Sequence, residues 1–400
     1  MSRSIPIHPA GRPALAAGLE FRVSPPLALY IHVPWCLRKC PYCDFNSHDL
    51  AGPLPETAYL DALIADLESA LPLIWGRPVV SLFFGGGTPS LLSPDGLDRF
   101  LAALRARVPL QPDAEITLEA NPGTAEAERF AGFRAAGVNR LSLGIQSFND
   151  RHLQALGRVH DAAEAHRAIT LARPHFERFN LDLMYGLPGQ SLAEAEADLA
   201  AALDYAPPHL SCYQLTLEPH TRFAHQPPSD LPDDDLCADM QDALEARLAA
   251  AGYGHYETSA FALPGRECRH NLNYWHFGDY LGIGAGAHSK LTLHDRVLRQ
   301  MRWKRPETYL QQVAAGQPLQ EQQEIDPAAL PFEFLMNALR LLDGVPPALF
   351  EARTAQPLTR IAVELARARA DGLLTPGPER IAPSDTGRRF LNRLLHYFPH

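Results

Sequence analysis

Long apolar runs and blocks of a single charge are both missing from this sequence. No apolar stretch reaches the length needed to cross a bilayer. The formal net charge is -10, and no block rich in Lys and Arg stands against it. Proteins that bind nucleic acids through the phosphates need such a basic surface. We therefore expect no nucleic-acid partner.

The N-terminal segment, residues 1–26, lacks the apolar centre of a signal peptide. Pro6, Pro9, Gly11 and Pro13 interrupt it, and its apolar run at residues 14–17 is too short for an export signal. We treat residues 1–26 as an N-terminal leader segment and expect a cytoplasmic protein.

Cysteine is scarce, with six in 400 residues. Cys212, Cys237 and Cys268 are scattered singly, which fits reduced thiols better than a disulfide framework. The composition is otherwise that of a globular chain with a sizeable core, with 46% hydrophobic and 20% charged residues. The length suggests about two domains.

The other three cysteines, Cys36, Cys40 and Cys43, have the spacing C-x3-C-x2-C and follow an apolar run at residues 27–33 that predicts a buried strand. Thiolates are soft ligands that suit zinc or an iron–sulfur cluster. A site held by protein alone normally has four donors, so three thiolates leave one coordination position for a small molecule. A structural zinc site completed by His32 or His48 is the alternative.

Strand-like and helix-like segments alternate along the chain, which predicts β-α units around a parallel sheet. Six strands are too few for a closed eight-stranded barrel and suit a partial (β/α)6 barrel, in which ligands bind at the C-terminal ends of the strands. The predicted strands are 27–33, 79–84, 115–119, 140–145, 180–184 and 210–216, and the predicted helices are 56–71, 94–106, 125–136, 162–172, 192–205 and 233–251.

The barrel is expected to cover residues 27–255, followed by a connecting segment at 256–325 and a mainly helical domain at 326–400. In this last part a helix at 358–371, a short hairpin and a helix at 386–397 have a winged-helix-like order. Because no basic stripe accompanies them, a helical cap on the barrel is favoured over DNA binding.

Polar residues and glycines follow the predicted strands where a ligand is expected. The turn at residues 85–90 holds Gly86, Gly87 and Thr88, and glycines there let backbone amides approach a ligand closely. Glu119 and Gln146 end the third and fourth strands. Arg158 and Asp182 follow, and a carboxylate in an apolar strand is costly unless it has a partner. A surface position for Glu119 and a buried ion pair for Asp182 are the structural alternatives.

A second motif, H-N-x-x-Y-W, begins at His270 and ends at Tyr274 and Trp275. Neutral imidazole is a normal axial ligand of haem iron, and the two aromatic residues offer flat apolar faces. Cys268 and His276 are competing ligands, and a histidine that only satisfies a hydrogen bond in the core is the alternative.

Together these motifs, from about Tyr30 to the C-terminal domain, resemble the coproporphyrinogen III oxidase-like branch of radical S-adenosylmethionine (SAM) proteins. In that superfamily three cysteines hold a 4Fe–4S cluster and SAM binds its fourth iron. The resemblance implies that Cys36, Cys40 and Cys43 are the cluster ligands. The SAM-site candidates it implies are Tyr30, Gly86, Gly87, Thr88, Glu119, Gln146, Arg158, Asp182 and Thr216.

Within this branch the chain resembles the haem chaperones most, because they share the H-N-x-x-Y-W motif. The resemblance implies that His270 ligates haem and that the partners are a haem-accepting target protein and an electron donor of the flavodoxin or ferredoxin type. It leaves open peripheral association with a membrane and the choice between monomer and dimer.

The oxidases of the branch carry a further cysteine two residues past the third cluster ligand, where this chain has Phe45. That cysteine is not a cluster ligand, so cluster binding is unaffected, but oxidase activity is not expected. An oxygen-independent coproporphyrinogen III oxidase, or another radical SAM enzyme of porphyrin metabolism, is the alternative function. A zinc-stapled barrel that acts as a binding scaffold is a third reading.

Overall fold

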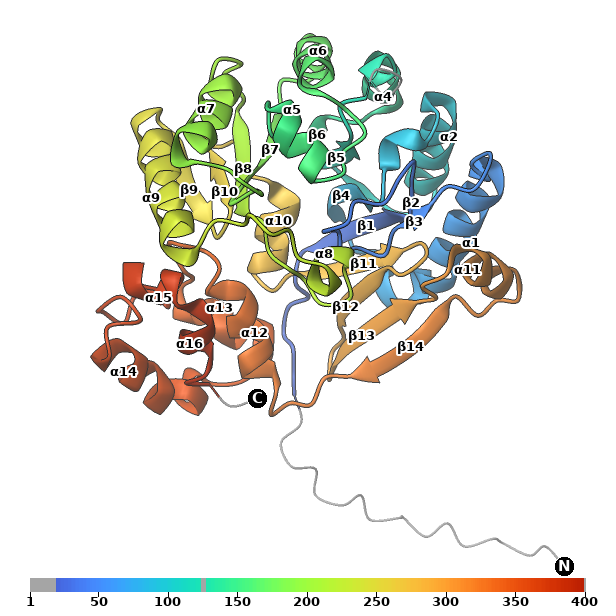
Figure 1. The fold of residues 1–400 in the computed structure, drawn as a ribbon. Helices are drawn as coiled ribbons and strands as arrows, with labels where there is room; N and C mark the ends of the chain where they lie inside the picture. Colours follow the sequence, from blue (N-terminus) through green and yellow to red (C-terminus); the bar gives the residue numbers. More distant parts are fainter. Residues whose placement is uncertain (1–18, 124–126, 399–400) are drawn as a thin grey trace, which may run out of the picture.

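The computed structural model describes residues 19–123 and 127–398, so residues 1–18 of the predicted leader lie outside it (Figure 1). Its centre is a run of six neighbouring parallel strands, as predicted. They are β1 (Leu27–Val33), β4 (Val79–Gly86), β5 (Leu110–Ala120), β6 (Arg140–Gln146), β7 (Phe179–Tyr185) and β8 (His209–Gln214).

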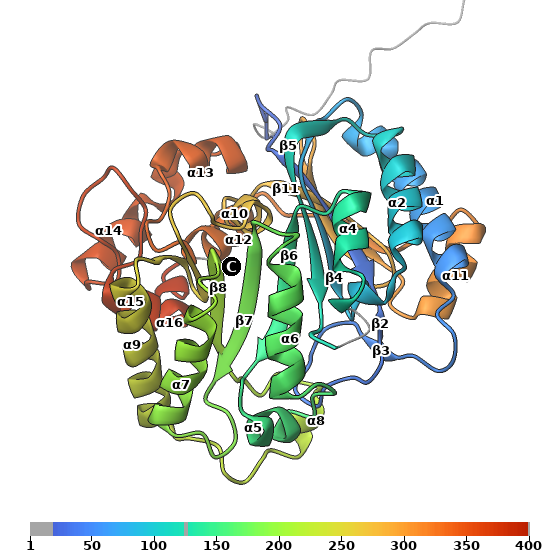
Figure 2. The ribbon, with the colours of Figure 1, turned by 90° about the horizontal axis from the view of Figure 1, so that it is seen from above.

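Helices between and after these strands cover the outer side of the curved sheet (Figure 2). Two of them begin with a capping box, in which Asp161 and Ser191 each exchange hydrogen bonds with a glutamate three residues later. The helices of this layer are α1 (Glu56–Ile74), α2 (Pro94–Arg105), α4 (Phe130–Ala136), α5 (Asp150–Ala155), α6 (Ala162–Ala172), α7 (Leu192–Leu203) and α9 (Asp234–Ala250).

Residues 256–325, predicted as a connecting segment, extend the sheet at both edges. β11 (Asp279–Ile283) pairs in parallel with β1, and three antiparallel strands follow it: β12 (His288–Thr292), β13 (Val297–Arg302) and β14 (Leu319–Glu324). At the other edge β10 (Ala260–Ala262) pairs with β8, and β9 (Gly254–Glu257) pairs with β10. These strands join the six parallel strands in one twelve-stranded sheet in the part of the chain that is described.

Shorter elements complete the barrel. Two of them are strands that form a separate pair next to the cysteine loop, β2 (Trp35–Cys36) and β3 (His48–Asp49). The others are η1 (Pro89–Leu91), α8 (Arg222–His225), α10 (Arg269–Trp275) and α11 (Pro306–Ala314).

The parallel strands are polar on their inner face and apolar on their outer face. Alternate side chains of a strand point to opposite faces, so Leu82 and Phe84 of β4 pack in the core beneath the helices while Ser81 and Phe83 face inward. The inner face therefore carries the polar side chains with which a ligand can interact.

The C-terminal part is mainly helical and has its own apolar core (Figure 1). Backbone hydrogen bonds between Leu373 and Ser384 and between Thr375 and Ala382 form the predicted hairpin. The helix predicted at 386–397 is wrong in one respect, because it is broken at Phe390 into two short helices. The elements are α12 (Leu330–Ala338), α13 (Pro347–Thr354), η2 (Leu358–Ile361), α14 (Ala362–Ala370), α15 (Asp385–Arg389) and α16 (Leu391–Leu395).

Within the described part of the chain, none of the helices combines the length and apolar character that crossing a membrane requires.

A buried ion pair ties the edge strands to the first helix of the barrel. Asp66 of α1 and Arg302 of β13 lie 3.2 Å apart, with side chains 0% and 1% exposed. The carboxylate of Asp66 also accepts hydrogen bonds from the Tyr309 hydroxyl at 2.9 Å and from the backbone N–H of Gly284 at 3.2 Å. One carboxylate thus holds three segments that are distant in sequence.

Replacing Asp66 by Asn should destabilise the protein by about 3–5 kcal/mol, because Arg302 would be left charged and buried without its partner. Urea unfolding followed by circular dichroism measures the change. The control is Asp61→Asn, which removes an exposed partner of Arg99 and should cost about 0.5 kcal/mol or less. Equal midpoints for the two variants would show that the Asp66 network does not hold the edge strands.

Candidate functional site

A cavity of about 410 Å³ lies at the C-terminal ends of the parallel strands. We call it the thiol cavity, because all three clustered cysteines line it. The predicted site residues that it brings together are Cys36, Cys40, Cys43, Gly86, Gly87, Thr88, Glu119, Gln146, Arg158 and Asp182.

The three cysteines follow β1: Cys36 ends the short strand β2, and Cys40 and Cys43 lie on the loop between β2 and β3. None of them is in a disulfide, and each is partly exposed. Burial raises the pKa of the Cys36 and Cys43 thiols. Among the described residues, no three His, Cys, Asp or Glu side chains are already grouped closely enough to hold a metal ion. The three thiols therefore surround one cavity, and the distances between them would have to shorten for all three to bind one metal centre.

The glycine turn after β4 forms another wall of the thiol cavity. Gly86 has a φ of +110°, and a Cβ there would lie 2.5 Å from the His32 ring. A Cβ on Gly87 would lie 2.5 Å from the carbonyl oxygen of Trp35. Only glycine fits at these two positions, because the turn packs directly on the strand that leads into the cysteine loop.

Two carboxyl groups reach the cavity from the inner face, one from β5 and one from β7, on either side of β6. Burial, and then the nearby Asp182, raise the pKa of Glu119 to about 8. Burial also raises the pKa of Asp182, which accepts hydrogen bonds from Ser142 at 3.1 Å and Asn180 at 2.7 Å. Glu119 is therefore no surface residue, and Asp182 is held by neutral donors and not by an ion pair.

Arg158 connects the cysteine loop with the strand ends. Its guanidinium donates to the side-chain oxygen of Asn121 at 2.7 Å, to the carbonyl of Gly144 at 2.9 Å and to the Cys40 sulfur at 3.6 Å. Asn121 in turn donates to the Thr88 hydroxyl at 3.0 Å. The Nε of Arg158 is buried without a partner among the described residues, so this side chain has unused hydrogen-bonding capacity beside the cavity.

Two predicted SAM-site residues do not line the thiol cavity. Tyr30 lies one layer deeper, with its hydroxyl 3.1 Å from Nδ1 of His32. Thr216 is exposed beyond the end of β8, and its hydroxyl donates to Glu218 at 2.8 Å.

Several residues that line the thiol cavity were not predicted. Two of them could have been found from alternation, since Ser142 and Gly144 precede the predicted Gln146 at every second position of β6. The sequence motifs alone do not reveal this register. The unpredicted lining residues are Arg38, Tyr42, Phe45, Pro89, Ala120, Asn121, Ser142, Gly144 and Tyr213.

His270 lies away from the thiol cavity, on α10. Figure 2 shows this helix at the opposite end of the sheet from β2, β3 and α8. The imidazole Nδ1 is 3.2 Å from the Ser81 hydroxyl, and the ring centre is 4.9 Å from that of Phe83 and 6.4 Å from that of Tyr30. Burial lowers the pKa of His270 to about 3, so the ring is neutral at ordinary pH.

The competing ligands near His270 are already engaged. Cys268 is fully buried, with its sulfur 3.6 Å from a carboxylate oxygen of Glu115. The Nδ1 of His276 lies 2.8 Å from the carbonyl of Leu272.

The two histidines proposed to complete a zinc site are also placed elsewhere. His32 has both ring nitrogens in contacts, with the Tyr30 hydroxyl at 3.1 Å and the Asn46 carbonyl at 2.8 Å. His48 does not line the thiol cavity. The zinc alternative therefore has no fourth ligand in place from these two residues.

Comparisons with known proteins place this geometry in a family. A profile of the radical SAM superfamily matches residues 30–202, and one of the HemN C-terminal domain matches residues 325–390. The "Heme chaperone HemW" of Escherichia coli is 50% identical over 376 residues, which cover 94% of this chain and 98% of that protein. The "Heme chaperone HemW" of Mycobacterium tuberculosis is 38% identical, covering 94% and 95%.

Among solved structures, the coproporphyrinogen III oxidase HemN of Escherichia coli, described as a radical SAM enzyme, matches with a TM-score of 0.80. It is 27% identical, and the match covers 94% of this chain and 90% of that one. This likeness confirms the fold from the barrel to the C-terminal domain. The higher identity to the chaperones, over nearly the full length, places the chain with them and not with the oxidases. The chain belongs to the HemW family within the radical SAM superfamily.

Proposed function

We propose that this chain is a haem chaperone that holds a 4Fe–4S cluster and SAM in the thiol cavity and binds haem through His270 for delivery to a haem-accepting protein. The observation that carries the cofactor part is the meeting of three free thiols, a glycine turn and two inner-face carboxyl groups in one cavity. The haem part is supported by the name "Heme chaperone HemW" of relatives that match nearly the whole chain.

The donor set of the thiol cavity fits these groups. Three thiolates suit a cluster with one iron left for another ligand, and a volume of about 410 Å³ is in the range of small-molecule sites. When bound, the cluster and SAM supply one-electron chemistry that side chains cannot perform.

The residues of this chain would hold SAM by charge and by shape. Glu119 and Asp182 are placed to accept hydrogen bonds from the ammonium group or the ribose hydroxyls, and Arg158 to pair with the carboxylate. Gly86, Gly87 and Thr88 shape the wall, and Gln146 closes the end of β6. Tyr30 and Thr216 do not line the cavity, so a direct contact with SAM is proposed for neither.

His270 would ligate haem iron as a neutral imidazole, which is the form its lowered pKa provides. The ring is buried against Ser81 and Phe83, so ligation requires α10 to move away from β4. Binding is therefore coupled to a local opening at the N-terminal end of the barrel.

An acidic electron donor of the flavodoxin or ferredoxin type fits the outer side of the cysteine loop. A hollow there is lined by Cys40 and Cys43, and its charged residues are Arg38, Lys39 and Arg222 against one carboxylate, Asp49. Positive side chains beside two of the thiols would attract a negatively charged protein on an otherwise acidic chain.

The oxidase alternative is favoured by the close likeness to HemN. Phe45 argues against it, because this ring, 60% exposed, stands at the thiol cavity where the oxidases carry a cysteine.

Anaerobically reconstituted protein, given reductant, SAM and coproporphyrinogen III, should release no more decarboxylated product than its Cys40→Ala variant, which lacks one cluster ligand. Product is measured by chromatography with mass detection, and iron analysis should give a lower iron content for the variant. Turnover by the parent protein well above that of the variant would establish the oxidase function instead.

SAM binding should weaken as the pH falls from 9 to 7, by up to about tenfold, because Glu119 with a pKa of about 8 becomes neutral and loses its attraction for a cationic ligand. Asp182 and Arg140 are the charged groups that act on Glu119. Calorimetry across this range measures the effect. In Glu119→Gln the plot of SAM affinity against pH should be flatter, because the titrating carboxyl group is gone. The titration of SAM itself affects both proteins equally, so the difference between the two plots reports on Glu119. Parallel curves would rule out this role for Glu119.

Replacing His270 by Ala should weaken haem binding by about tenfold or more, which is roughly 1.4 kcal/mol, and should shift the Soret band because an axial ligand is lost. Haem titration followed by absorption measures both. The matched control is His276→Ala at the opposite end of α10, which should leave the spectrum unchanged. Identical spectra for His270→Ala and the parent protein would contradict the proposal.

A further inference from the structure

A second cavity, of about 560 Å³, opens at the other end of the barrel from the thiol cavity, beside the start of α10. It is formed by the first residues of β5, the end of α4, and the loops that precede β7 and α10. We call it the arginine cavity. It is lined by Asp113, Glu115, Arg134, Asn139, Arg173, Pro174, His175, Glu177, Arg178, Arg266 and Arg269.

The arginine cavity is positively charged, whereas the chain as a whole is negatively charged. Five arginines and a histidine line it against three carboxylates, although the formal net charge of the protein is -10. Two of the arginines are neutralised locally, since Arg178 pairs with Glu115 at 3.0 Å and Arg269 with Asp113 at 2.8 Å. The other three arginines face the third carboxylate, Glu177, so their positive charge is only partly balanced.

These three arginines, Arg134, Arg173 and Arg266, are exposed. Within residues 19–123 and 127–398, no carboxylate lies at ion-pair distance from any of them. Arg134 donates only to the carbonyl of Val138, at 3.3 Å. Gathering like charges around one hollow is unfavourable without a counter-charge, and guanidinium groups bind carboxylates in a planar two-point geometry. The hollow is thus built to take an anionic group.

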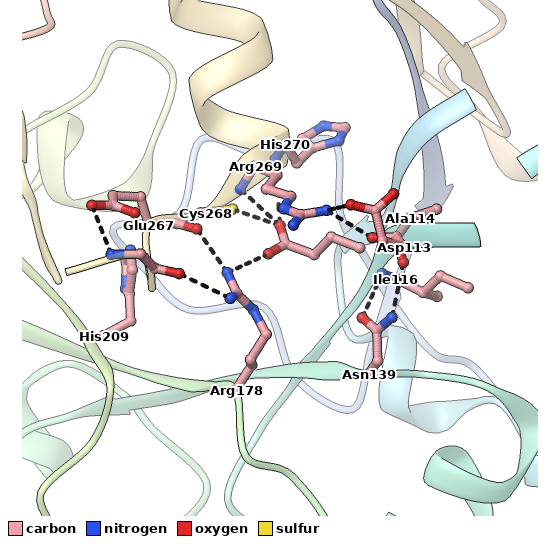
Figure 3. A network of polar contacts seen from close by, with 12 residues as sticks. Asp113, Ala114, Ile116, Asn139, Arg178, His209, Glu267, Cys268, Arg269 and His270 are labelled. Atoms are coloured by element: carbon pink, nitrogen blue, oxygen red, sulfur yellow. Dashed lines mark hydrogen bonds and ion pairs between the residues drawn. The ribbon is translucent and has the colours of Figure 1, made fainter. Parts of the chain in front are cut away.

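The wall of the arginine cavity is bonded directly to the helix of His270. One oxygen of Glu115 accepts from the backbone N–H of Arg269 at 2.9 Å and of His270 at 3.4 Å, while the other accepts from Arg178. Figure 3 shows this network, with His270 on the helix above it. A single carboxylate therefore separates the backbone of His270 from the cavity.

Arg178 also holds the loop that leads into α10. It donates to the carbonyl of Glu267 at 2.9 Å and to that of Gly265 at 3.2 Å (Figure 3). An incoming carboxylate that engages Arg178 would compete with Glu115 and loosen the tether that keeps His270 buried. Ligand binding in the arginine cavity and exposure of the imidazole are in this way linked.

We propose that the arginine cavity binds the carboxylate side chains of an iron porphyrin whose iron is ligated by His270. This inference rests on the proposed haem function. It is favoured over a small inorganic anion because haem has its two carboxylates on one edge, away from the metal. That layout matches an anion site next to, but separate from, an imidazole.

The double variant Arg173→Gln/Arg266→Gln tests the proposal. Both side chains are exposed and outside the described ion pairs, so the fold should survive. Hemin should bind at least tenfold more weakly to this variant than to the parent protein. Hemin dimethyl ester, which has the same iron but no free carboxylates, should bind equally to both. Absorption titrations of the full-length protein measure the four affinities.

The matched control is Arg99→Gln/Arg167→Gln, which removes the same charge from exposed positions on α2 and α6. It should leave hemin affinity unchanged. A loss for hemin and its ester alike, or no loss for hemin, would overturn the proposal. Binding of inorganic phosphate that the arginine variant loses while its hemin affinity stays unchanged would overturn it as well.

The two proposals fail in different ways. If His270→Ala leaves hemin binding and its spectrum unaltered, haem ligation by His270 is wrong, whatever the arginine variant does. If His270→Ala weakens hemin and its ester equally while the arginine variant changes neither, the ligation stands and the carboxylate site is wrong.

Discussion

The structure depends on one constraint, which is the two-residue period of strands in a curved parallel sheet. One set of side chains must pack beneath the helices and the other must face the inside of the curve. Here the outer set is apolar and the inner set carries Glu119, Asp182 and Tyr213. An inner polar side chain is costly unless it finds a partner. The inner face is therefore largely polar, and three of the proposed SAM-binding residues, Glu119, Gln146 and Asp182, belong to it.

The sequence predicted the six parallel strands well, because each is a short apolar run bounded by turns, and the motifs at their ends come together as a consequence. Cys36, Gly86 and Glu119 meet because parallel strands end at the same edge of the sheet. The edge strands were not predicted, since β12 to β14 contain many polar residues and gain their stability from pairing. Their attachment through Asp66 and Arg302 joins positions far apart in sequence, which no local pattern reveals.

The sequence motifs name most of the residues that line the thiol cavity. They do not show how deeply each residue is buried. Thr216 ends up exposed because the chain leaves the sheet directly after β8. Tyr30 lies below the cavity because it precedes the end of β1 by three residues. Asn121 was missed although it joins Thr88 to Arg158. It follows the strand and has no motif of its own, so only its contacts reveal it.

The burial of His270 has a kinetic consequence. Haem bound to an exposed imidazole is released at the rate at which the iron–nitrogen bond breaks. Haem that binds this imidazole must do so with α10 open, so the free energy of that opening lowers the rate of binding, and the tendency of α10 to close again favours release. Haem bound in this way would have a residence time governed by the protein.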